Sequence, residues 1–375
     1  MAYIITAVGA GGKTTYLKKR ALEYLRQGKR CALTTTTHIW PVESGPDCFG
    51  ILEESGKLRA PDAQSFAEIC EKYEIVLVEG DGSHCMPVKI PSEREPVIPD
   101  GTDEIAVLMG AHAIGRRIDV VCQRYEGSGE EKVTAELLEE IARQRYILPL
   151  QKRYPKAHIF YELSQMPPSD ERIVGVLMAS GFGRRYGGNK LLAPFHGRPL
   201  YLQVLDHMVQ ALGKENVIVV TQYEEIRDTA GRLGIESVWN DQAIEGISAS
   251  IRLGTQKALS LGADAAVFFA GDMPYLPSEE IRLYAKQFLA SAKPYGCMEF
   301  GKEHICTNPG AFRLDCGAKK LLQLTGDRGA MRIMKQEPWN IYYYQIAPEW
   351  ARDIDVNPLP AGQSQTSSHR TDPGL

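Results

Sequence analysis

Two glycine-rich loops in this sequence carry basic residues at spacings that suit phosphate binding. The first, VGAGGKTT (Val8–Thr15), fits the P-loop pattern, with Ala7 in place of its first glycine. In such a loop, backbone N–H groups converge on phosphate oxygens, and the positive end of the following helix adds to the attraction. Lys13 can reach the terminal phosphates, and the Thr14 hydroxyl suits Mg²⁺. The alternative is a glycine-rich turn with an incidental lysine.

Two acids follow a later apolar run in IVLVEGDGSHCMPVKIP, namely Glu79 and Asp81. P-loop folds keep the carboxylates that organise Mg²⁺ and water at such a strand end, although acids there are often simply solvated. We therefore expect Thr14, Glu79 and Asp81 to hold a metal, while Lys89 either adds positive charge or lies on the surface. The residues expected to bind a nucleotide are Gly9, Gly11, Gly12, Lys13, Thr14 and Thr15.

The second loop, LMASGFGRRYGGNKLL, also follows an apolar run, but its lysine lies nine residues after Gly181, so it is not a P-loop. Arginine and lysine suit a triphosphate attacked at its α-phosphorus, because charge builds on the non-bridging oxygens and the departing pyrophosphate. Taken alone, this signal is moderately specific. The expected catalytic residues are Arg185 and Lys190, and the expected nucleotide-binding residues include Gly181, Gly183 and Gly187.

Three later segments support the second loop. AVFFAGDMPYL places Asp272 at the carboxyl end of a buried strand, where α/β sheets bind ligands, and a carboxylate there suits Mg²⁺. The alternative is a turn aspartate before Pro274. In GISASIRLG, Ser248 offers a hydroxyl to a ligand or caps the helix. Asp355 in DIDV is expected to assist the metal, unless this segment is ordinary surface.

Alternating strands and helices must position these loops, as in parallel sheets covered by helices. ELSQMPPSDER (Glu162–Arg172) breaks the pattern and indicates a domain boundary. The expected strands before the boundary are Tyr3–Ala7, Arg30–Thr35, Ile75–Glu79, Ile105–Met109 and Ala157–Tyr161, with helices at Lys13–Gln27, Ala63–Lys72 and Thr134–Gln144. Those expected after it are strands Ile173–Met178, Asn216–Thr221 and Ala265–Ala270, with helices at Leu200–Leu212, Tyr223–Leu233 and Ile247–Ser260.

Size and composition agree with two globular domains. The chain has 375 residues, 43% hydrophobic and 24% charged, and a formal charge of -4. This balance argues against binding to nucleic acid or to an anionic membrane. The sequence shows no signal peptide and no apolar stretch of the roughly 20 residues that a membrane span needs, so we expect a cytoplasmic protein. Its 8 cysteines form no C-x-x-C pair and are expected to be reduced thiols.

Four motifs of the first half, VGAGGKTT, TTTTHIW, VEGDGSHCMPVKIP and EPVIP, resemble the YqeC family in order and spacing. Members of that family are accessory proteins of selenium-dependent molybdenum hydroxylases. The resemblance covers about residues 1–165 and implies nucleotide binding, with a hydroxylase apoenzyme as a partner. Where a base-reading Asn-Lys-x-Asp segment would stand, this chain has ELSQ (Glu162–Gln165), so ATP and GTP both stay open.

The second half, about residues 172–357, is similar to nucleotidyltransferases that attach a nucleotide to the molybdopterin phosphate. The key positions of their opening pattern fall on Gly181, Arg185, Gly187 and Lys190, and their metal-binding aspartate falls on Asp272. KLL, GISASIRLG, TNPGAF, GDRGA and DID are more similar to molybdenum cofactor cytidylyltransferase than to the guanylyltransferase. The loop departs from the pattern at Ser180, Gly183 and Tyr186, so CTP is a preference.

The two resemblances imply an α/β protein of two domains, each with its own nucleotide. A P-loop NTPase-like parallel sheet is expected over residues 1–165 and a Rossmann-like nucleotidyltransferase sheet over 172–357, followed by a disordered tail at 358–375. CMP would pass from CTP to molybdopterin phosphate, with Mg²⁺ on Asp272 and Asp355. Two alternatives stay open: another small phosphate acceptor, or a nucleotide-switched cofactor chaperone or insertase with an inactive transferase half.

Overall fold

The computed structural model describes residues 2–41, 45–83, 86–127, 129, 131–182, 189–301, 303–327 and 329–354. The expectations for Gly183, Arg185, Gly187 and Asp355, and for the tail, lie outside the described residues. The chain forms two compact units. The first comprises Met1–Asp170, Tyr284–Cys306 and Met334–Ala347, and the second comprises Glu171–Leu283, Thr307–Ile333 and the described residues from Pro348 onward.

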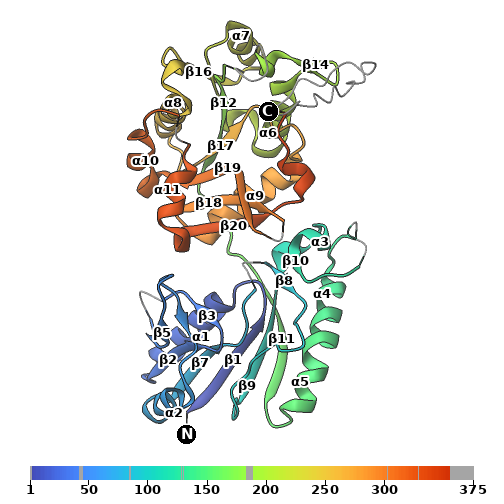
Figure 1. Ribbon diagram of the computed structural model, residues 1–375, viewed down its shortest axis with the longest axis vertical. Helices are drawn as coiled ribbons and strands as arrows, with labels where there is room; N and C mark the ends of the chain where they lie inside the picture. Colours follow the sequence, from blue (N-terminus) through green and yellow to red (C-terminus); the bar gives the residue numbers. More distant parts are fainter. Residues whose placement is uncertain are drawn as a thin grey trace, which may run out of the picture. The chain divides into compact units, whose positions relative to one another are not determined.

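A six-stranded sheet carries the first glycine-rich loop, and its strand order is β11-β9-β1-β7-β2-β4 (Figure 1). All of its neighbouring strands run parallel. Because a parallel sheet is covered on both faces, its strands are continuous apolar runs, as in the IVLVE of β7. The strands are β1 (Tyr3–Gly9), β2 (Cys31–Thr35), β4 (Asp47–Cys48), β7 (Ile75–Glu79), β9 (Glu104–Gly110) and β11 (His158–Ser164).

Helices pack on both faces of this sheet. Successive strand residues point to opposite faces, so Ile5 packs with Leu17 of α1, whereas Ile4 packs with Ile69 of α2. The helices are α1 (Lys13–Arg26), α2 (Ala63–Lys72), α3 (Ile118–Val121), α4 (Ala135–Ala142) and α5 (Leu148–Arg153). Short strands pair outside the main sheet: β3 (His38–Ile39), β5 (Ile51–Leu52), β6 (Leu58–Arg59), β8 (Val88–Lys89) and β10 (Cys122–Gln123).

The expected strands of the first half are present, and the largest difference in length is at β11. The strand expected at Ala157–Tyr161 was ended too early, because β11 continues to Ser164, which pairs with Gly110 of β9. Polar residues are tolerated there because β11 is an edge strand with one neighbour in the sheet. The strand thus extends into the segment that was assigned to the boundary.

A seven-stranded sheet carries the second loop, in the order β16-β15-β12-β17-β19-β18-β20 (Figure 1). Its first strand, β12, pairs in parallel with β15 and β17. The sheet is mixed, because β19 runs antiparallel to β17, a direction that apolar periodicity does not reveal. The strands are β12 (Ile173–Ala179), β15 (Val217–Thr221), β16 (Glu236–Trp239), β17 (Ala265–Ala270), β18 (Tyr295–Phe300), β19 (Ile305–Arg313) and β20 (Ile341–Gln345).

The three helices that the sequence predicted in this half are present, and their ends agree with the expected ones to within one residue. They are α6 (Leu200–Leu212), α7 (Glu224–Leu233), α8 (Ile247–Ser260), α9 (Ser278–Ser291), α10 (Leu314–Leu322) and α11 (Met331–Gln336). A short hairpin of β13 (Pro194–Phe195) and β14 (Arg198–Pro199) follows the second loop. Among the described residues, no helix has the length and apolar character required to cross a membrane.

Candidate functional site

The first glycine-rich loop, Val8–Thr15, forms a tight turn between β1 and α1. Gly9, Gly11 and Gly12 have φ angles of 91°, 76° and 100°, which side chains rarely adopt. A Cβ on Gly9 would lie 2.3 Å from the Leu108 carbonyl oxygen, so this turn is also pressed against β9. No side chain of the described residues caps the start of α1, as expected where backbone N–H groups serve a ligand.

Lys13 is folded back over the loop rather than extended into solvent. Its Nζ donates to the Gly9 carbonyl oxygen at 2.8 Å and lies 3.2 Å from Asp81 Oδ1. Asp81 also accepts a hydrogen bond from the Gly9 N–H at 3.1 Å. Both side chains are buried, so the loop lysine has an internal counter-ion.

Thr14 and Glu79 form the second polar pair at this sheet edge. Thr14 Oγ1 donates to Glu79 Oε2 at 2.6 Å, and Thr15 beside it is exposed. Burial raises the pKa of the Glu79 carboxyl, against the lowering effects of Lys13 and of the hydrogen bond from Thr14. A hydroxyl and a carboxylate held together at a strand end are oxygen ligands of the type that Mg²⁺ prefers.

The threonine-rich segment lies against the same acid. Thr35 Oγ1 and the Thr36 N–H both donate to the Glu79 carbonyl oxygen at 3.0 Å. Thr36 Oγ1 donates to the Val97 carbonyl oxygen at 2.7 Å, which ties in the EPVIP motif. Three motifs that are separate in the sequence, TTTTHIW, VEGDGSHCMPVKIP and EPVIP, therefore meet where the sequence predicted a P-loop site.

Two further residues contact this site: Ser164, which the sequence analysis missed, and Lys89, for which it left two alternatives. Ser164, at the end of β11, donates a hydrogen bond to the Gly11 carbonyl oxygen of the P-loop. Lys89 is fully buried, so the surface alternative for this residue is wrong. Its Nζ lies 3.5 Å from Asp81 Oδ2 and 2.9 Å from Glu95 Oε1. The length of β11 and the burial of Lys89 both depend on the pairing of their strands with strands that are distant in the sequence.

The second loop begins immediately after β12, where the structure describes its first residues. Ser180 Oγ donates to the Val220 carbonyl oxygen at 3.1 Å, so this hydroxyl points into the sheet. Gln222 Nε2 donates to the Ser180 carbonyl oxygen at 2.6 Å, and the Tyr223 hydroxyl donates to that of Gly181 at 2.8 Å. Gln222 and Tyr223, which the sequence analysis missed, follow β15 directly, and the strand-end rule applied to Asp272 would have found them.

Lys190 and Asp272 meet at the end of this loop. Lys190 Nζ lies 2.6 Å from Asp272 Oδ2, and both side chains are about one-fifth exposed. They can meet because β12 and β17 are parallel neighbours, with Met178 opposite Ala270. The Ile354 N–H donates to the Asp272 carbonyl oxygen at 3.0 Å, so the described end of the DIDV segment also lies here.

Ser248 lies near other residues of the predicted motifs, but its side chain is not exposed. It is fully buried near the start of α8, and its Oγ accepts from Arg252 Nη1 at 3.3 Å. The preceding Ile247 N–H donates to Asp327 Oδ1 at 3.3 Å, which brings GISASIRLG and TGDRGA together. Ser248 therefore supports this turn through Arg252.

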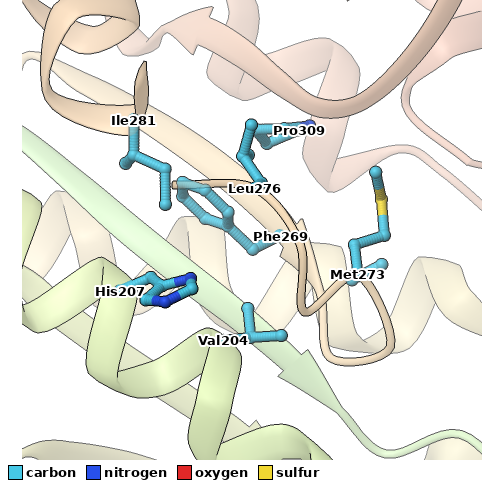
Figure 2. Close-up of a pocket in the computed structure, with 8 residues that line it drawn as sticks. Val204, His207, Phe269, Met273, Leu276, Ile281 and Pro309 are labelled. Carbon is cyan, nitrogen blue, oxygen red and sulfur yellow. The ribbon is translucent and has the colours of Figure 1, made fainter. Parts of the chain in front are cut away.

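Figure 2 shows a small apolar hollow beside the turn that follows β17. Val204 and His207 from α6 face Phe269 of β17 across it, with Met273 from the turn. His207 Nδ1 has no hydrogen-bond partner among the described residues. With mostly apolar walls, the hollow suits packing of the Asp272 turn and does not suit phosphate binding.

Comparison with known proteins agrees with both resemblances. Residues 5–126 match the model of the YqeC protein family, and residues 175–340 match that of the MobA-like NTP transferase domain. YqeC of Escherichia coli (strain K12) is 32% identical over 31% of this chain and 54% of the relative. Molybdenum cofactor guanylyltransferase of Rhodobacter capsulatus is 34% identical over 36% of this chain and 65% of the relative.

The chain thus spans between half and two thirds of the length of these relatives. Among solved structures, Rv0371c from Mycobacterium tuberculosis H37Rv is 19% identical, with a TM-score of 0.43, over 50% of this chain and 95% of that protein. The two family matches follow one another without overlap. The chain therefore carries a YqeC region followed by a MobA-like NTP transferase domain.

Proposed function

We propose that the MobA-like domain, residues 172–357, transfers CMP from CTP to the terminal phosphate of molybdopterin and releases pyrophosphate. The observation that carries this proposal is the Lys190–Asp272 pair, 2.6 Å apart, at the carboxyl ends of neighbouring parallel strands. A cation and a hard oxygen ligand side by side are the groups that a bound triphosphate requires.

Asp272 offers Mg²⁺ one carboxylate, which is partly exposed at the ligand-binding edge of the sheet. Asp355 is proposed as a further ligand, since it follows Ile354, whose backbone bonds to Asp272. Mg²⁺ bound there would neutralise part of the triphosphate charge. In the YqeC region, Thr14 and Glu79 offer a hydroxyl and a carboxyl oxygen to a metal at a buried position, with Asp81 proposed as the third residue.

In the proposed reaction the protein positions the two substrates and neutralises phosphate charge, and it supplies no nucleophile. Lys190 Nζ and the proposed Arg185 hold positive charge against the phosphate oxygens, and Gln222 and Tyr223 fix the start of the loop. An oxygen of the acceptor phosphate attacks the α-phosphorus in line, the bond to the β-phosphate oxygen breaks, and pyrophosphate leaves with the electron pair.

GTP is a second candidate donor. The name of the 34% identical relative from Rhodobacter capsulatus, molybdenum cofactor guanylyltransferase, favours GTP, whereas the KLL and DID segments favour CTP. A competition between equimolar CTP and GTP, with molybdenum cofactor as the acceptor and labelled product as the readout, decides between them. Pyrophosphate release with another small phosphate, and none with the cofactor, would overturn the proposed acceptor.

The YqeC region, residues 1–165, is proposed to bind ATP or GTP through Gly9, Gly11, Gly12, Lys13, Thr14 and Thr15. Its support is the arrangement of Lys13 and Thr14 beside two buried acids. We propose that this nucleotide serves delivery of the cofactor to a selenium-dependent molybdenum hydroxylase apoenzyme. Nucleotide-dependent capture of such an apoenzyme by the full chain, lost in Lys13→Ala, tests this step.

The two proposed sites are separable by experiment. Full-length protein with molybdenum cofactor and each labelled nucleoside triphosphate is compared with Lys13→Ala and Lys190→Ala. Loss of transfer in Lys190→Ala alone supports two independent sites. Transfer that persists in Lys190→Ala would contradict the proposed catalytic site, and transfer lost in Lys13→Ala would show that the reactions are coupled.

A further inference from the structure

Asp81 is a buried carboxylate that lies between two buried lysines. Its Oδ1 is 3.2 Å from Lys13 Nζ, and its Oδ2 is 3.5 Å from Lys89 Nζ. The side chains of Asp81 and Lys89 are fully buried, and that of Lys13 is nearly so. Of these two cations, only Lys13 belongs to the P-loop.

Lys13 cannot neutralise a phosphate while it is held in this arrangement. Its Nζ donates to the Gly9 carbonyl oxygen and pairs with Asp81, so nucleotide binding requires it to leave an internal partner. A buried carboxylate left without a cation is strongly destabilising. Lys13 can therefore leave Asp81 without a large loss of stability only if another cation stays beside this carboxylate.

Further contacts hold Lys89 beside Asp81. Its Nζ also donates to Glu95 Oε1 at 2.9 Å and to the Gly82 carbonyl oxygen. Its own carbonyl oxygen accepts from the hydroxyl of the buried Tyr146 at 3.2 Å, which fixes the backbone. Three anchors besides Asp81 thus hold this lysine in place.

We propose that Lys89 is a positioning residue that keeps the charge of Asp81 paired, so that Lys13 can exchange Asp81 for the phosphates of a nucleotide. This proposal rests on the proposed nucleotide binding by the YqeC region. Without Lys89, Lys13 becomes the sole close cation of Asp81 among the described residues, and the internal pair competes more strongly with the ligand.

The chain offers a clean variant for this test. Lys89→Met keeps the apolar stem and removes the charge, while Asp81 retains Lys13 and Glu95 retains Arg124 at 2.6 Å. Each acid keeps one cation, so the variant is expected to fold. Circular dichroism and thermal unfolding check this, and Lys89→Arg serves as the conservative variant.

The experiment measures binding of methylanthraniloyl-labelled ATP and GTP to the full chain, in EDTA so that no metal contributes. Lys89→Met should weaken binding by about tenfold or more, whereas Lys89→Arg should stay near wild type. In Asp81→Asn/Lys89→Met, Lys13 has no carboxylate to favour, so affinity should return to within about threefold of Asp81→Asn. A merely structural role of Lys89 would show no such rescue.

Lys29→Met is the matched control, because Lys29 forms a surface pair with Glu74 at 2.8 Å. Wild-type affinity in Lys89→Met, or a double variant as weak as Lys89→Met, would overturn the role of Lys89. A wild-type chain that binds neither nucleotide, or one whose affinity is unchanged by Lys13→Ala, would instead overturn nucleotide binding by this region and this proposal with it.

Discussion

Lys190 Nζ and Asp272 Oδ2 form a 2.6 Å ion pair between the loops that follow two neighbouring parallel strands. Both side chains are about four-fifths buried, so the pair is more strongly coupled than an ordinary surface pair. A triphosphate that enters this edge must share the two groups. The lysine and the aspartate are therefore expected to contribute to the same step.

Loss of either charge should remove most of the transferase activity. In Lys190→Met or Asp272→Asn, we expect kcat/KM for pyrophosphate release to fall by about 10²–10³, because charge in the transition state is no longer balanced. Steady-state kinetics with nucleotide and molybdenum cofactor measure this. Asp206→Asn, which removes a surface pair with Arg198 at 2.7 Å, is the control and should change the rate less than about twofold. Near-normal turnover in Asp272→Asn would refute the assigned role.

Gln222 should matter for nucleotide binding more than for turnover. Gln222→Leu keeps the size of the side chain but removes the 2.6 Å hydrogen bond to the Ser180 carbonyl oxygen, so the start of the loop loses an anchor. We expect the nucleotide KM to rise by about 5–10-fold while kcat stays within about twofold. Gln64→Leu, at an exposed position of α2, is the matched control. An unchanged KM would show that the loop is held without this bond.

The Thr14–Glu79 contact could be predicted from sequence because the rules behind it are local. A glycine turn after one apolar run fixes Lys13 and Thr14, and Glu79 ends another. The carboxyl ends of parallel strands lie at one edge, and β1 and β7 are neighbours, so Thr14 and Glu79 meet at 2.6 Å. The sequence supplies the residues of this pair and the type of element that brings them together.

What could not be predicted depends on which distant segments pack together. Lys89 was equally compatible with a surface position, because the sequence does not show that its strand pairs with β10 or that Tyr146 packs against it. Ser164 reaches the P-loop only because β11 runs three residues longer than its apolar pattern indicates. The apolar pattern likewise does not indicate that β19 runs antiparallel to β17.

Gly11 should tolerate alanine less well than another glycine with the same backbone. A Cβ on Gly11 would lie 2.3 Å from the Gly110 backbone nitrogen, whereas one on Gly28 would meet nothing within 4 Å, and their φ angles are 76° and 77°. We expect Gly28→Ala to cost about 1–2 kcal/mol for the backbone alone and Gly11→Ala to cost about 3 kcal/mol or more. Chemical unfolding of both variants measures the difference. Equal losses would mean that β9 yields freely to the added methyl group.

The Glu95 carboxyl should make the stability of the YqeC region sensitive to acid. Burial opposes its ionisation, but Lys89, the Ser92 backbone and Arg124 outweigh that effect and lower its pKa from 4.5 to about 2. Because the folded-state pKa is depressed, the stabilisation is present above the ordinary pKa and is lost as the pH falls from 4.5 toward 2.

We expect Glu95→Gln to reduce the free energy of unfolding by about 2–3 kcal/mol at neutral pH, and the difference from wild type to shrink at about pH 3. Guanidinium unfolding of both chains at the two pH values measures it. Glu74→Gln, which removes the exposed pair with Lys29, controls for general acid effects. A difference that is the same at both pH values would show that the ionised Glu95 is not the source, because below the ordinary pKa of 4.5 the unfolded chain carries a protonated carboxyl that must lose its proton on folding.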